Sequence, residues 1–579
     1  MNDQTPPTPP RLEDIQYWTG VIGEAQQMML EAIAEAQGRP GALDAATLFG
    51  DPERIAAAQA EFWRDSVQLW QHFLDPAKGP ASPVADKAAR DKRFAAPQWA
   101  DNPIFDLIRQ SYLMLCGYLL RGIDAIEGLT PKQREQLRFA TQAFADAMSP
   151  SNFALTNPLV LEKAIETKGR SLLKGLEHML ADLSKGQLTQ TDPAAFTIGE
   201  NIAATPGKVI KRTPLYELIH YAPTTETVNA IPVVIFPAWI NRFYILDLNP
   251  EKSFVRWSLD QGLSVFVVSW KSADASMAGM TMDDYVLGGQ LDAIDTVRDL
   301  LGVESVHAIG YCVAGTHLAA LLAYLAAKGE AHKITSATFL AAQVDFTAAG
   351  DLNLFVSDTQ LELIGQLAGE KGYLDGRYMA AAFNLLRGRD LIWSYVVNNY
   401  LLGQDYMPFD LLHWNGDTTN LPLRWHVSYL QDCYRDNKLV QPGGISIGGV
   451  PIDLRRVETP TYVQAGREDH IAPAESVWKA TQHFAGPVRF VLAGSGHIAG
   501  VINPPQANKY QHWTNDSKTS TLSEFLAGAT ETKGSWWPDW AGWVRALSSG
   551  TVPAKRSRVP GKGTLKAIED APGRYVRTR

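Results

Sequence analysis

Three residues in the second half of the chain have the types and the order of a nucleophilic catalytic triad. Cys312 lies in the segment GYCVAG (residues 310–315), between a run expected to form a strand and a run expected to form a helix. Such a strand-to-helix turn, the nucleophile elbow, exposes its nucleophile above a sheet on a strained backbone flanked by small residues. We therefore interpret Cys312 as the candidate nucleophile, against the alternative of a small buried hydrophobic residue.

An acid and a histidine follow Cys312 in the order that a nucleophile elbow requires. Asp469 comes shortly after the apolar run 460–465, and His497 lies in the glycine-rich segment GSGHIAG (494–500), after the run 488–493. Glu468 is the rival acid. His470 is the rival base, but it adjoins Asp469, so a hydrogen bond between the two within one turn is sterically awkward. His497 is therefore preferred as the base.

A thiol in this position could accept an acyl group. An imidazole can take the proton of a cysteine, whose pKa is about 8.5 when free, and the thiolate then attacks activated carbonyl carbons. Asp469 would orient His497 and stabilise its charged form. The oxyanion would be held by the backbone N–H of Val313 and by one from the loop 237–240, which we expect to follow the first strand of this domain and in which we choose Ile240. Because thioester exchange is nearly balanced in energy, acyl transfer is favoured over hydrolysis.

The elbow departs from the usual pattern G-x-S-x-G at two positions. Cys312 replaces the serine, and Ala314 replaces the last glycine. An alanine fits where φ is negative, and Gly315 could supply the conformational freedom that position 314 lacks. Ala314 thus puts the geometry of the elbow in question more than the type of reaction.

The elements that must position these residues indicate an α/β-hydrolase catalytic domain with a parallel sheet. Short β-branched runs occupy 232–236, 264–270 and 306–310, and a helix-length segment, 283–301, precedes the third run. The segment 347–452 is too long for a structureless loop in a compact domain. We expect it to form a helical lid over the sheet edge where ligands bind.

The chain is predicted to have two domains. Residues 1–200 form an all-α N-terminal domain, in which Thr130 begins a helix through a capping box with Gln133. The composition shifts between residues 185 and 211, so the catalytic domain is placed at 201–579. From residue 551 the chain has eight Lys or Arg against two acids, and this basic extension, 551–579, is expected to be loosely held.

The bulk composition excludes several classes of protein. The 579 residues are 45% hydrophobic and 20% charged, as in globular proteins, and the net charge of −9 argues against nucleic acid as the main partner. Three cysteines cannot form a disulfide framework, so a reducing compartment, the cytoplasm, is expected. No signal peptide and no transmembrane run of roughly 18 apolar residues is found. No metal-site spacing or phosphate-binding glycine loop is found either, so no metal and no bound cofactor is expected.

Further motifs make the sequence resemble the class I polyhydroxyalkanoate synthases, which polymerise 3-hydroxyacyl groups from coenzyme A thioesters into storage polyester. The resemblance covers about residue 90 to the C-terminus. Its motifs, besides the cysteine elbow, are FAAPQWADNPIFD (94–106), NRFYILDL (241–248), FDLLHW (409–414), NPP after the His497 loop (503–505) and GSWWPDW (534–540).

The resemblance implies roles and partners. Cys312 would carry the growing chain, His497 would activate the thiol, and Asp469 would assist either His497 or the incoming 3-hydroxyl group. The substrate would be an (R)-3-hydroxyacyl-CoA, and the enzyme a cytoplasmic homodimer on the surface of polyester granules. The small Ala499 resembles the short-chain pattern, as for 3-hydroxybutyryl-CoA. Trp414 resembles a family tryptophan and is expected either to contact substrate or to pack within the lid.

Two alternative functions are compatible with the same residues. An acyl-CoA thioesterase or related hydrolase could use the same Cys-His-Asp set and would release monomeric hydroxy acid. A granule-surface or scaffold protein with a vestigial elbow would bind polyester without releasing CoA.

Overall fold

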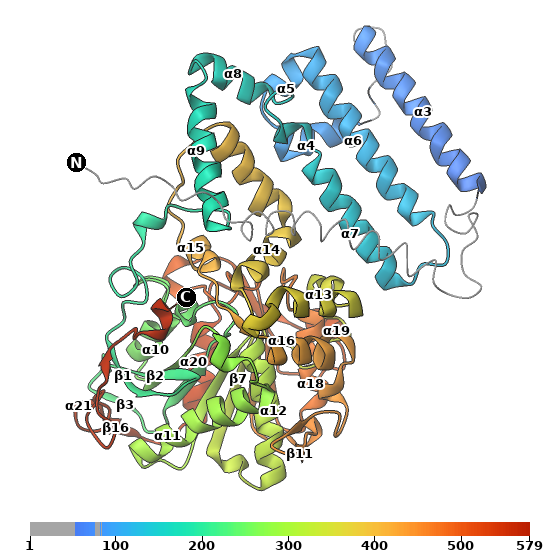
Figure 1. The fold of residues 1–579 in the computed structure, drawn as a ribbon. Helices are drawn as coiled ribbons and strands as arrows, with labels where there is room; N and C mark the ends of the chain where they lie inside the picture. Colours follow the sequence, from blue (N-terminus) through green and yellow to red (C-terminus); the bar gives the residue numbers. More distant parts are fainter. Residues whose placement is uncertain (1–51, 76–81, 83, 579) are drawn as a thin grey trace, which may run out of the picture. The chain divides into compact units, whose positions relative to one another are not determined.

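The structure is a computed structural model that describes residues 52–75, 82 and 84–578 (Figure 1). The chain divides into two compact units. Unit 1 comprises residues 1–192 and 378–408, and unit 2 comprises residues 193–377 and 409–579. The division after Asp192 lies near the boundary expected at residue 200, whereas residues 378–408, expected in the lid, group with unit 1.

Helices make up all the regular structure in the described part of unit 1. The capping box predicted at Thr130 is confirmed, because its side chain accepts the N–H of Gln133 while the Gln133 side chain binds the N–H of Thr130. The helices are α3 (Pro52–Leu74), α4 (Ala85–Arg90), α5 (Gln98–Asp101), α6 (Pro103–Asp124), α7 (Pro131–Ala147), α8 (Pro158–Glu166) and α9 (Arg170–Lys185), with short helical turns η1 (Lys92–Phe94) and η2 (Pro150–Asn152) and π-helices η10 (Arg389–Trp393) and η11 (Val396–Leu401).

Unit 2 is built on a mixed sheet of eleven strands. Its six central strands, from β5 to β13, are parallel, and the strands on either side of them are antiparallel. The order across the sheet is β17 (Glu569–Asp570), β1 (Gly207–Arg212), β2 (Tyr216–Tyr221), β5 (Val265–Trp270), β4 (Val233–Phe236), β6 (Val306–Tyr311), β7 (Ile334–Leu340), β12 (Thr461–Gly466), β13 (Val488–Ala493), β14 (Gln511–Thr514) and β15 (Thr530–Lys533).

The central strands are apolar because both faces of the sheet are covered. Every residue of β4, β5 and β6 is buried. The helix α10 (Phe254–Asp260) contacts β5, α11 (Asp292–Leu301) contacts β4 and β6, and α12 (Val313–Lys328) contacts β6 and β7. The other helices of unit 2 outside the insertion 347–452 are α17 (Ala474–Trp478), α18 (Ala480–His483), α19 (Leu522–Ala527), α20 (Trp537–Ala546) and α21 (Ala554–Ser557). The predicted α/β fold class is thus confirmed.

The sequence analysis misplaced the start of this sheet. The loop 237–240 was expected after the first strand of the domain, but it follows β4, because β1, β2 and the short strand β3 (Thr227–Asn229) come earlier. The antiparallel strands β1 and β2 extend the parallel core at its edge, because β2 pairs with β5 and β1 pairs with β2.

The insertion between residues 347 and 452 is largely helical, as expected. Its role as a lid stays a prediction. Its helices are α13 (Asp358–Ala368), α15 (Asp410–Gly416), α16 (Leu423–Tyr429) and the π-helix η12 (Leu430–Arg435) in unit 2, together with η10, η11 and most of α14 (Gly376–Leu386) in unit 1.

The expectation of a loosely held C-terminal extension is wrong for residues 551–578. Strand β16 (Thr551–Pro553) pairs with β3, and β17 pairs with β1. The buried carboxylate of Glu217 accepts the backbone N–H groups of Arg574 and Tyr575, each at 3.0 Å. The basic residues of the extension therefore belong to a segment held by distant strands.

Within the described residues, no helix has both the length and the apolar character needed to cross a membrane.

Candidate active site

Cys312 lies at the sharp turn between β6 and α12. It directly follows Tyr311, the last residue of β6, and directly precedes Val313, the first residue of α12. Its φ of 53° and ψ of −126° place a non-glycine residue in a strained region of the backbone. The backbone N–H of Cys312 donates to Leu340 O at 2.9 Å, and the side chain is half-buried. This is the geometry of a nucleophile elbow.

Two glycines let strand and helix approach each other at the elbow. A Cβ on Gly310 would lie 2.5 Å from the Cα of Gly315, and a Cβ on Gly315 would lie 2.4 Å from the Cβ of Ala342 and 2.9 Å from the carbonyl oxygen of Gly310. Ala314 is fully buried within α12 and needs no glycine. The departure at position 314 is therefore accommodated, because the close approach falls on Gly315.

We expect Gly315→Ala to destabilise the protein by about 1–3 kcal/mol, because the added methyl group meets backbone and Ala342 in a region that is already packed. Urea unfolding of the full-length chain measures the change in the free energy of unfolding. The matched control is Gly365→Ala in α13, where a Cβ meets nothing within 4 Å and alanine favours the helix by about 0.5–1 kcal/mol. Equal stability of Gly315→Ala and wild type would contradict the packing argument.

Asp469 and His497 come together because their strands are parallel neighbours. Asp469 follows β12 and His497 follows β13, so both lie at the carboxyl edge of the sheet. His497 Nδ1 donates to Asp469 Oδ2 at 2.8 Å. The other oxygen, Oδ1, accepts the backbone N–H groups of Ile471 at 2.9 Å and Ala472 at 2.8 Å. Both carboxylate oxygens are thereby occupied, and Nε2 of the imidazole is left for the thiol.

The rivals of Asp469 and His497 are placed differently. Glu468 is exposed, whereas the carboxylate of Asp469 is fully buried. The backbone oxygen of His470 accepts the N–H of Asp351 at 3.1 Å, which anchors the turn, and it is His497 that contacts Asp469.

The electrostatics of the site favour a charged imidazole. Burial alone would lower the pKa of His497, but electrostatic interactions and hydrogen bonds with the neighbouring Asp469 and Cys312 hold this pKa well above its ordinary value. Tyr311 stacks on the ring with centroids 5.6 Å apart, and its hydroxyl donates to His497 O at 3.2 Å. The contacts with Asp469 and Cys312 favour the protonated, charged form of the His497 ring.

The raised pKa of His497 makes part of the folding stability depend on pH. Because the folded-state pKa exceeds the unfolded value of about 6.5, this contribution is fully present below that value and is lost as pH rises through the folded-state pKa. We expect the difference in unfolding free energy between wild type and His497→Gln to shrink as pH rises from about 6 to about 10. Urea titrations at each pH measure it; a difference that grows with pH would contradict this sign.

The two expected oxyanion donors occupy different settings. Val313 is the first residue of α12, where a backbone N–H has no partner within the helix. Ile240 lies half-buried in the loop after β4. The next N–H in that loop, from Asn241, is already bound to Thr419 Oγ1 at 2.9 Å. The assignment of Val313 and Ile240 stays a prediction.

Trp414 and Ala499 are the two further candidate residues for substrate binding, and for Trp414 packing within the lid was the alternative. Trp414 is 6% exposed within α15, and its indole Nε1 donates to Arg242 O at 2.7 Å, so it packs in the core of unit 2. Cys312 lies against the same cluster of apolar side chains. Ala499 is half-buried, two residues beyond His497.

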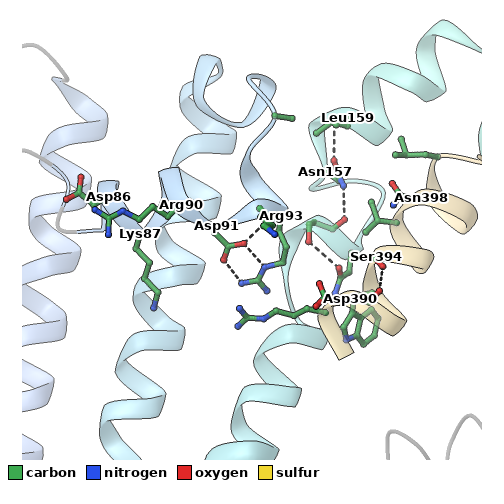
Figure 2. Close-up of a pocket in the computed structure, with 18 residues that line it drawn as sticks. Asp86, Lys87, Arg90, Asp91, Arg93, Asn157, Leu159, Asp390, Ser394 and Asn398 are labelled. Carbon is green, nitrogen blue, oxygen red and sulfur yellow. Dashed lines mark hydrogen bonds and ion pairs between the residues drawn. The ribbon is translucent and has the colours of Figure 1, made fainter. Parts of the chain in front are cut away.

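A cavity of about 920 Å³ lies within unit 1 (Figure 2). Two of its arginines are held by acids: Arg93 binds Asp91 at 2.7 Å and Asp146 at 3.1 Å, and Arg389 binds Asp146 at 2.6 Å. Neither cysteine nor histidine is found among its described lining residues, so it offers no counterpart of the Cys312 site. The described residues also contain no group of His, Cys, Asp or Glu that could hold a metal ion.

The strand order, the elbow and the residues at the carboxyl edge of the sheet show that unit 2 has the α/β-hydrolase fold. Residues 231–504 match the model of the alpha/beta hydrolase fold, and residues 90–258 match the model of the poly-beta-hydroxybutyrate polymerase (PhaC) N-terminus.

Relatives that match nearly the whole chain show to which family of this fold it belongs. The chain is 45% identical over 534 residues to the poly(3-hydroxyalkanoate) polymerase subunit PhaC of Rhizobium meliloti, covering 91% of this chain and 86% of the relative. It is 41% identical over 575 residues to the subunit PhaC of Cupriavidus necator, covering 98% and 95%. The chain belongs to the poly(3-hydroxyalkanoate) polymerase family, and it is an enzyme of the transferase type.

Proposed function

We propose that this enzyme polymerises (R)-3-hydroxyacyl groups from coenzyme A thioesters into polyester through an acyl group on Cys312. The observation that carries the proposal is the 2.8 Å contact between His497 Nδ1 and the buried Asp469 carboxylate beside the elbow thiol. Membership of the polymerase family supports the same reaction class. The proposed reaction requires no bound cofactor.

In the first step the Cys312 thiolate attacks the thioester carbonyl carbon. The carbonyl oxygen becomes an oxyanion, for which the N–H groups of Val313 and Ile240 are the proposed donors. Collapse of this intermediate breaks the carbon–sulfur bond to CoA, and the imidazolium of His497 gives its proton to the leaving thiolate. The products are acyl-Cys312, neutral His497 and CoA.

In the second step His497 acts as a base. It takes the proton of a 3-hydroxyl group, whose oxygen attacks the acyl-Cys312 carbonyl; an ester bond forms, and the Cys312 thiolate leaves. Asp469 assists His497 in both steps, rather than the 3-hydroxyl group directly. This choice rests on the occupation of both its oxygens, one by His497 and one by two backbone N–H groups.

We extend the proposal to substrate size and assembly. The resemblance to the class I enzymes and the small Ala499 beside His497 favour short units such as 3-hydroxybutyryl-CoA. The same resemblance favours a cytoplasmic homodimer at the surface of polyester granules.

The test is to incubate the full-length chain with 3-hydroxybutyryl-CoA. We expect CoA release, detected with a thiol reagent, insoluble poly(3-hydroxybutyrate), and an acyl group on the peptide that carries Cys312 by mass spectrometry. Soluble 3-hydroxybutyrate without polymer would identify a thioesterase instead. Polyester binding without CoA release would favour a granule scaffold, and an acyl group on another residue would overturn the proposed mechanism.

A further inference from the structure

We infer that Gln343 is the positioning residue that fixes the carboxylate of Asp469 and ties the acid loop, the turn 467–473, to the elbow helix. This inference rests on the proposed function of Cys312, Asp469 and His497. Gln343 lies three residues beyond the end of β7 and is 5% exposed. No motif in the sequence pointed to it.

The side-chain amide of Gln343 acts on Asp469 through a single peptide group. Its Nε2 donates to the carbonyl oxygen of Ile471 at 3.0 Å. The N–H of the same peptide group, that of Ala472, donates to Asp469 Oδ1 at 2.8 Å. Hydrogen bonds in such a chain polarise one another, so the amide strengthens the donor that holds the carboxylate. With Oδ1 held, Oδ2 faces His497 Nδ1.

The other end of the same residue reaches the elbow helix. The backbone oxygen of Gln343 accepts the hydroxyl of Thr316 at 2.7 Å, and Thr316 N in turn donates to Cys312 O at 3.2 Å. One residue therefore links the helix that presents the nucleophile with the turn that presents the acid. Movement of the elbow helix or of the acid loop would change the position of Cys312 relative to His497. Gln343 restrains both segments, through its contacts with Thr316 and with Ile471.

The contacts explain why glutamine suits this position. The carbonyl oxygen of Ile471 can only accept, so the group that faces it must be the NH₂ of the amide. The amide oxygen then faces the hydroxyl of Ser476 at 2.7 Å. An apolar side chain of similar length would leave the Ile471 carbonyl without this donor in a buried setting, where an unmade hydrogen bond is costly.

The alkylation of Cys312 by iodoacetamide tests this inference without any acyl substrate. The rate, measured on the peptide that carries Cys312 between about pH 5 and pH 9, follows the thiolate fraction and so reports the Cys312–His497–Asp469 relation. A free thiol has a pKa of about 8.5, so about half of it is ionised at that pH. In wild type we expect fast alkylation of Cys312 already well below that pH. In Gln343→Met we expect the profile to move toward that of a free thiol, with a rate about tenfold lower at neutral pH, as expected for loss of one buried hydrogen bond.

Two control variants separate positioning from general destabilisation. Ser476→Ala removes a hydrogen bond at the other end of the amide but leaves its donor on Ile471, so we expect a lower unfolding midpoint with the wild-type alkylation profile. Gln360→Met makes the same substitution at a 5% exposed glutamine of α13, and we expect no change of profile.

The outcomes are distinct. A wild-type profile in Gln343→Met, or an equal shift in Ser476→Ala, would overturn the role of Gln343. A wild-type Cys312 that already reacts like an ordinary free thiol would overturn the proposed function itself, and with it the role of Gln343, before any substitution is compared.

Discussion

Cys312→Ala is expected to abolish both CoA release and polymer formation, with a loss of at least about 10⁴-fold in kcat, as found when the nucleophile of a catalytic triad is removed. The physical reason is that no acyl-enzyme can form without the thiol. His497 and Asp469 then remain hydrogen-bonded to each other but have no group to activate. CoA release from 3-hydroxybutyryl-CoA and the yield of polyester measure the effect.

Cys116→Ala is the matched control for this loss. Cys116 is a buried cysteine of α6 in unit 1, so the same substitution removes a thiol outside the proposed site. We expect this variant to retain turnover, with at most reduced stability. A Cys312→Ala enzyme that still makes polymer would end the proposal, whatever the behaviour of the control.

His497→Gln is expected to lower kcat by about 10³- to 10⁴-fold at neutral pH, because the thiol loses its base and the leaving CoA thiolate loses its acid. The loss should diminish as pH rises toward about 8.5, where about half of an unassisted thiol is ionised without help from the imidazole. Steady-state CoA release across this pH range gives the measurement.

The control here is His483→Gln. The imidazole Nε2 of His483 contacts Asp345 at 3.0 Å, so these two residues form a second His–Asp pair in unit 2. This second pair has no role in the proposed mechanism. We expect near-normal kcat from this variant. If His497→Gln and His483→Gln lost activity equally, the effect would be structural and His497 would not be the base.

Local patterns in the sequence were enough to predict the elbow. The turn around Cys312 has a short signature because strain and crowding there restrict residue types within a few positions. The order of Asp469 and His497 after their strands likewise predicted which side chains meet, since carboxyl ends of neighbouring parallel strands share one edge of a sheet. The helical N-terminal region and its capping box followed from periodicity and capping chemistry of the same local kind.

Features that depend on distant pairing were missed. The antiparallel strands β1 and β2 and the packed extension 551–578 are stabilised by partners far along the chain, such as Glu217 with Arg574 and Tyr575. The basic, proline- and glycine-containing composition of the extension carries no sign of those partners. The grouping of residues 378–408 with unit 1 has the same origin.

By itself, the sequence determined the residue types of the proposed site, their order and the fold class, because these depend on local backbone constraints and on apolar periodicity. Only the tertiary structure decided which glycine of the elbow bears the close approach, that Trp414 packs in the core, and that Gln343 reaches both the acid loop and the elbow helix. The physical reason is that a hydrogen bond or a packing contact between distant segments depends on positions in space, which no local spacing of residues encodes.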